Sequence, residues 1–94
     1  MFTVKADPVV LEKLADLLRQ ETPDACIRLK EYTLGGGRHA RKMLGPGIDV
    51  QDEARDALYV IGGVPFIASK ELRDSYGDTF ALLLINGHLQ VTRT

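Results

Sequence analysis

The sequence predicts an α+β fold, with one long N-terminal amphipathic helix packed on a small, mostly antiparallel β-sheet system of about 6–7 short strands. Three observations predict it. Apolar residues recur at helical spacing only near the N-terminus, the apolar runs after residue 25 are short, and glycine-containing turns separate those runs. At 94 residues and 10.4 kDa, the chain has room for a single domain, residues 1–94.

The helix is expected after a short opening strand, Phe2–Lys5. Asp7 is a suitable N-cap and Pro8 suits the first helical position, where its missing N–H costs nothing. The apolar stripe then consists of Val10, Leu11, Leu14, Leu17 and Leu18. Because a proline disfavours helical geometry at the residue before it, we expect the helix to end before Pro23.

Most of the remaining chain is expected to form strands. Ile27–Tyr32 alternates, which places Arg28, Lys30 and Tyr32 on one face. The three glycines 35–37 end this strand, and residues 38–44 are expected to return from it. Gly-Pro-Gly at 45–47 predicts a turn, and the polar stretch 48–55 predicts a surface loop.

Two β-hairpins are expected in the second half of the chain. Residues 57–61 and 64–68 flank Gly62-Gly63, and residues 79–85 and 88–92 flank Asn86-Gly87, both favoured two-residue turns. Pro65 places its strand at a sheet edge, or lies among the first residues of that strand. Between the hairpins, Ser69 is expected to cap a short helix, 70–75, that ends at Gly77.

Composition excludes several classes of function. Twelve Lys and Arg residues against 13 acidic residues give a net charge of −1, so we expect no nucleic-acid partner. The longest apolar run, residues 80–85, is far shorter than the roughly 20 residues that span a membrane. With no signal peptide and a single cysteine, the expected location is the cytoplasm, without a membrane partner. Cys26 is expected to have a packing role.

The order of four segments resembles the HesB/IscA family, the A-type carriers of iron–sulfur cluster assembly. The segments are 7–14 (compare "LTDxAxxxLxxLL"), 27–29 ("LRL"), 33–37 ("xSGCSG") and 63–72 ("GVxVVVDxxSLxxL"). The resemblance implies the HesB fold and a role related to iron–sulfur assembly. It places Gly36 where the family has its loop cysteine, and no Cys-Gly-Cys occurs up to Thr94. The chain is therefore expected to be a divergent member without cluster ligands, and no cofactor is expected.

The glycine-rich stretch is the main candidate site, as a loop that binds a small anion or an unknown protein partner. Its residues are Gly35, Gly36, Gly37, Arg38, His39 and Arg41. Consecutive glycines can direct amide N–H groups into one concavity, and the neighbouring cations add positive charge. A flexible hairpin with a solvated basic strand is the simpler interpretation.

Other functions have weaker support from the sequence. His39 and His88, with carboxylates and across a homodimer, are the basis of an alternative metal-handling function. The acidic residues at 49, 52, 53 and 56 lack the pattern of a calcium loop and are expected to form a solvated surface. No nucleophile–base pair can be named, so we expect no catalytic residues and a non-enzymatic protein. Homo-oligomerisation stays open.

Overall fold

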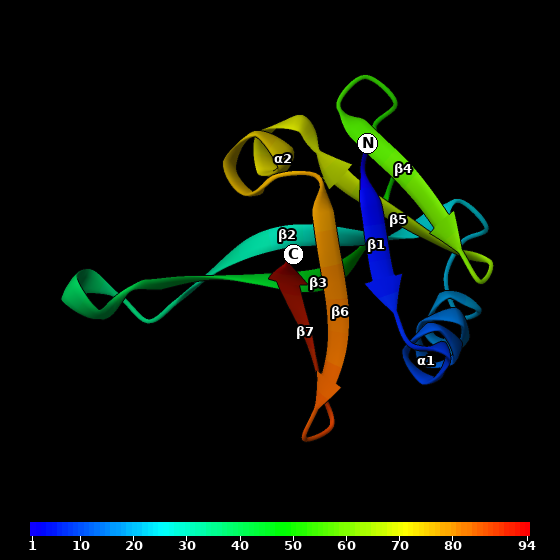
Figure 1. Ribbon diagram of the computed structural model, residues 1–94, viewed down its shortest axis with the longest axis horizontal. Coiled ribbons are helices and arrows are strands. Elements are labelled where there is room, and N and C mark those ends of the chain that lie inside the picture. Colours follow the sequence, from blue (N-terminus) through cyan, green and yellow to red (C-terminus); the bar gives the residue numbers. More distant parts are fainter.

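The computed structural model describes all 94 residues and is α+β, with two short helices and seven strands in two sheets (Figure 1). The helices are α1 (Pro8–Leu18) and α2 (Lys70–Tyr76), and a 3-10 turn spans Gly37–His39. The strands are β1 (Thr3–Ala6), β2 (Ala25–Leu34), β3 (Arg41–Val50), β4 (Asp56–Ile61), β5 (Val64–Ser69), β6 (Thr79–Ile85) and β7 (His88–Arg93). Neither helix is long and apolar enough to cross a membrane.

The predicted architecture of one long helix on a sheet is wrong. The strands form two sheets, ordered β1-β6-β7 and β3-β2-β5-β4, and β1–β6 and β2–β5 are parallel pairs. In Figure 1, β6 and β1 run across β2 and β3. α1 has only 11 residues and buries only Val10 and Leu14. Three helical turns offer little apolar surface, so the strands bury most of theirs against one another.

The core lies between the two sheets and is supplied mostly by strands. Its residues are Phe2, Val4, Val10, Leu14, Ile27, Leu29, Val64, Phe66, Ala68, Leu72, Phe80, Leu82 and Val91. The ring of Phe2 meets that of Phe80 edge-on, with centroids 6.0 Å apart, and contacts Tyr59 of the other sheet in the same manner. Aromatic contacts therefore join the sheets at the N-terminal end of the chain.

Both predicted hairpin turns are confirmed. Gly62, Gly63, Asn86 and Gly87 all have positive φ, as a type I′ turn requires. α2 begins as predicted, because the Ser69 hydroxyl accepts a hydrogen bond from the Leu72 N–H. It ends at Tyr76, one residue later than expected.

The turn predicted within β3 is wrong, whereas one of the two alternatives predicted for Pro65 in β5 is confirmed. The Gly-Pro-Gly stretch at 45–47 is not a turn, because β3 continues through it to Val50 opposite β2, which also shortens the expected surface loop. β5 is not an edge strand, since it lies between β2 and β4. Pro65 lies among the first residues of its strand, as the other alternative predicted: it is the second residue of β5, and the pairing with β2 begins only at Phe66.

Candidate functional site

The distal part of the β2–β3 hairpin, residues 31–44, is called the arm. Figure 1 shows it projecting to the left, away from every other element. Residues 31–43 are all exposed. The arm holds three of the twelve Lys and Arg residues and one of the 13 acidic residues, so its net charge is +2 and that of the remaining chain is −3. A basic projection thus extends from an acidic body.

All six predicted loop residues, 35–39 and 41, lie together at the tip of the arm. The 3-10 turn uses the N–H groups of His39 and Ala40, which donate to the carbonyls of Gly36 and Gly37. Gly35 and Gly37 have positive φ, but Gly36 between them is extended at φ −147° and ψ 166°. A residue in extended geometry does not direct successive N–H groups toward one point.

One face of the arm combines apolar and basic side chains. Tyr32 lies opposite Met43 and Leu34 lies opposite Arg41, so all four side chains share a face because cross-strand partners do. Tyr32, Leu34 and Met43 are among the exposed large apolar residues of the chain. Tyr, Met and Arg are enriched in protein–protein interfaces. The alternation of β2 predicted which side of the strand Tyr32 occupies, but its partners depend on the register of β3.

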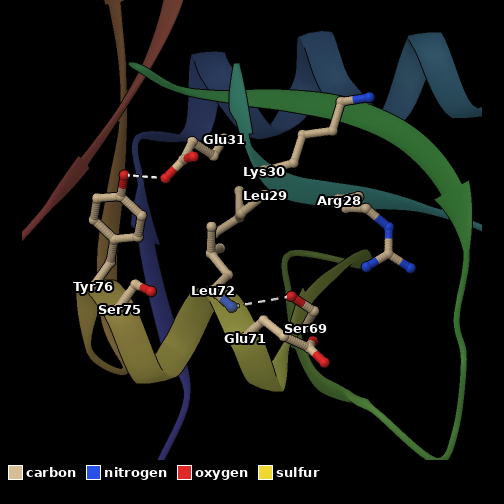
Figure 2. A pocket seen from close by; sticks show the side chains of 9 residues that line it. All are labelled: Arg28, Leu29, Lys30, Glu31, Ser69, Glu71, Leu72, Ser75 and Tyr76. Carbon is tan, nitrogen blue, oxygen red and sulfur yellow. Dashed lines mark hydrogen bonds between the residues drawn. The ribbon is translucent and has the colours of Figure 1, made fainter. Parts of the chain in front are cut away.

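The opposite face of the arm is fixed to the body at its root. The Tyr76 hydroxyl donates to Glu31 (Figure 2). Lys42 Nζ lies 3.6 Å from the same carboxylate. The guanidinium of Arg93 lies 6.0 Å from the centre of the Tyr76 ring. The hydrogen bond to Glu31 raises the pKa of Tyr76. The bond between Tyr76 and Glu31 thus holds the start of the arm against α2, and Arg93 of β7 contacts the same tyrosine ring.

A groove of about 260 Å³ lies between β2 and α2 beside these contacts (Figure 2). Its polar side chains are mostly engaged: Glu31 with Tyr76, Glu71 with Arg55, and Ser69 with the backbone of Leu72. A second, apolar hollow of about 350 Å³ lies between α1 and β3, lined by Leu14, Leu17, Ile27, Pro46, Gly47, Ile48 and Leu89. Neither includes a residue of the arm's tip.

Sequence reasoning missed the ion-pair cluster around Arg28. Arg28 donates two hydrogen bonds to the Asp56 carboxylate, at 2.6 and 2.8 Å, and one to Asp49 at 2.8 Å. The Asp56 side chain is only 1% exposed, so the expectation of a solvated acidic surface is wrong for this residue. The hydrogen bonds from Arg28 hold the pKa of Asp56 below its usual range. The cluster is engaged internally, and its role is structural.

The remaining candidates are single residues that the fold keeps apart. His39 lies at the tip of the arm and His88 at the β6–β7 turn, so one chain does not bring them together. Cys26 is buried, as expected for a packing role, and burial raises the pKa of its thiol. No His, Cys, Asp and Glu residues form a group of three or more that could hold a metal ion.

No family model, curated protein or solved structure matches this chain. Membership of the HesB/IscA family therefore stays a prediction.

Proposed function

We propose that this is a non-enzymatic binding protein whose arm engages an acidic surface of a protein partner. The observation that carries the proposal is the exposed arm face, on which Tyr32, Leu34 and Met43 lie beside Arg41. Such a face combines apolar contact area with a cation that can form a bidentate pair with a carboxylate. Arg38 and His39 at the tip extend the basic surface.

The stiffness of the arm supports this role. Its strands remain paired from the body out to Leu34 and Arg41, so the tip is presented by a regular hairpin. The bond between Tyr76 and Glu31 restrains its root. Preorganised elements lose less conformational entropy on binding than flexible loops, which favours recognition by this hairpin. Within the proposed kinship to the HesB/IscA family, the protein would be a member that has exchanged cluster carriage for partner binding.

Titration of ¹⁵N-labelled protein with poly-glutamate, as an acidic polypeptide, tests the proposal by NMR. Amide signals of residues 32–43 should shift saturably. The variant Arg38→Glu/Arg41→Glu should lose these shifts, because attraction becomes repulsion. The control Lys5→Glu/Lys13→Glu changes the net charge equally at exposed positions off the arm, and it should keep them.

Three outcomes would count against the proposal. Shifts that spread over all basic residues, do not saturate and vanish in moderate salt would indicate charge screening only. If both double variants lost the amide shifts to the same extent, net charge and not the arm would govern binding. Saturable shifts confined to residues 35–38 on addition of inorganic phosphate, with none from poly-glutamate, would identify a small-anion site.

A further inference from the structure

We propose that the outer edge of β4 pairs with β4 of a second copy of this chain, antiparallel and centred on Tyr59, to form a two-fold dimer. The inference goes beyond the proposed function and uses no residue of the arm. It rests on the unpaired backbone of β4, on the residues that border this edge, and on the surface area of the chain.

The backbone of β4 is unpaired on one side. β4 pairs only with β5, and the two-residue turn makes Ile61 and Val64 a hydrogen-bonded pair. Because bonded and non-bonded pairs alternate, Leu58 and Val60 direct their N–H and C=O groups away from β5. Pro65 lies opposite Val60 in a non-hydrogen-bonded pair, so its missing N–H removes no hydrogen bond between β4 and β5. The N–H of Asp56, on the same outer side, donates to the Asp52 carbonyl, and no other segment bonds to the backbone of Leu58 or Val60.

This edge lacks the features that protect edge strands in native proteins, which are charged residues and proline. The other three edge strands have them: Lys5 in β1, Pro46 in β3 and Arg93 in β7. The one charged residue of β4, Asp56, is buried and paired with Arg28, and residues 57–61, Ala-Leu-Tyr-Val-Ile, carry no charge and no proline. The side chains of Leu58 and Val60 are 47% and 56% exposed. An uncharged edge of β-branched and aromatic residues is a template for strand pairing.

The strand β4 of a second copy can pair with this edge. In an antiparallel pair centred on Tyr59, Leu58 faces Val60 of the second copy and Ala57 faces its Ile61. The outward backbone groups of Leu58 and Val60 then form about four intermolecular hydrogen bonds. The same contacts occur twice about the axis, as a two-fold interface requires, and no like charges meet.

The chain exposes more surface than is typical of a monomer of its mass. A monomer of this mass typically exposes about 5,400 Å². This chain exposes 6187 Å². The surplus of about 800 Å² is close to one partner's share of a standard protein–protein interface. The projecting arm, whose residues 31–43 are all exposed, contributes to this surplus.

Sedimentation velocity over a concentration series tests the dimer. The wild-type chain should show twice its 10.4 kDa mass. Leu58→Lys should weaken dimerisation about tenfold or more, because it removes the apolar cross-strand contact with Val60 of the second copy and places like charges on both sides of the two-fold axis. The matched control Leu83→Lys changes a residue of similar exposure on the central strand β6, and it should leave the dimer intact. A wild-type monomer at millimolar concentration, or equal effects of both variants, would overturn the proposal.

Cysteine cross-linking tests the register and does not depend on the lysine variant folding. In a Cys26→Ser background, Leu58→Cys mixed with Val60→Cys should form a disulfide-linked dimer on mild oxidation. Neither protein alone should do so, since Leu58 faces Val60 and not Leu58 of the second copy. The Cα separation in such pairs, about 5.5 Å, suits a disulfide. Equal cross-linking of the single proteins and the mixture would contradict this register and with it the proposed dimer.

Discussion

Tyr32 explains why a Gly-Pro-Gly stretch remains in a strand. Its ring lies over β3, where a Cβ at Gly45 would come within 2.7 Å of Tyr32 Cε2. Its hydroxyl donates to the Pro46 carbonyl at 2.9 Å, and Lys30 Nζ lies 4.9 Å from the ring centre. The space left by the glycines is thus filled from the opposite strand, so a side chain on β2 restrains the conformation of β3.

Replacement of Gly45 by Ala should therefore destabilise the fold. In a strand, Gly→Ala usually stabilises by about 0.5–1 kcal/mol. Here the added methyl group must displace the Tyr32 ring, with loss of a hydrogen bond worth about 0.5–1.5 kcal/mol and of the ring's packing. Urea unfolding should show a lower free energy of unfolding for Gly45→Ala, and a higher one when it is made in a Tyr32→Ala background. If Gly45→Ala changed the free energy of unfolding in the same direction in the wild-type and the Tyr32→Ala backgrounds, this role of Tyr32 would be contradicted.

The sequence predicted the side of β2 on which Tyr32 lies, but not what it covers. Alternation is a local property, and it correctly grouped Arg28, Lys30 and Tyr32 on one face. The position of Tyr32 over Gly45 depends on the register of the β2–β3 hairpin, and the connection at 35–40 is not a two-residue turn from which that register could be predicted. By local rules alone, Gly-Pro-Gly is a turn.

At the scale of elements, α1 is less buried than its predicted apolar stripe implies, although the position of its first turn was predicted correctly. The five-residue stripe was identified from its period, yet Leu17 is 43% exposed. α1 meets β2, β5 and β6 without lying along the face of one sheet, because the two sheets cover each other. Helical period indicates which face is apolar, whereas the neighbours of the helix decide how much of that face is covered.

Two substitutions in α1 compare a covered with an exposed position of its apolar face. Leu14→Ala should lower the free energy of unfolding by about 2–5 kcal/mol, since Leu14 is only 1% exposed and belongs to the core. Leu17→Ala removes the same atoms one helical turn later, where solvent already reaches the side chain, and it should cost about 0.5 kcal/mol or little more. Chemical denaturation of both variants measures the difference. Equal losses would mean that the full stripe is buried in solution.

At the scale of the whole molecule, Arg28 links parts of the chain that are distant in sequence. It joins β2 to Asp49 near the end of β3 and to Asp56 at the start of β4. The Asp52 N–H also donates to the Asp56 carboxylate, so the loop between β3 and β4 closes over the same ion pair. Separations of 21 and 28 residues leave no local pattern, which is why the acidic stretch was predicted to be solvated.

This ion pair should make stability depend on pH. An unfolded Asp has a pKa of about 3.9. Arg28 holds the pKa of folded Asp56 below its ordinary value. The stabilisation is therefore complete above the unfolded pKa and is lost as the pH falls through the lower folded pKa. At pH 7, Asp56→Asn should cost about 3 kcal/mol, at the lower end of the range for breaking a buried pair, because Arg28 keeps Asp49.

Urea titrations of both proteins from pH 7 downward measure this dependence. The gap in free energy of unfolding between wild type and Asp56→Asn should stay constant at higher pH and narrow below about pH 4. The control Asp74→Asn removes an exposed carboxylate that pairs with Lys70 one helical turn away, and it should change stability little at any pH. A gap for Asp56→Asn that does not narrow in acid would mean that the lost contribution is packing or neutral hydrogen bonding. Arg28 would then hold β2, β3 and β4 together through hydrogen-bond geometry rather than through the charge of Asp56.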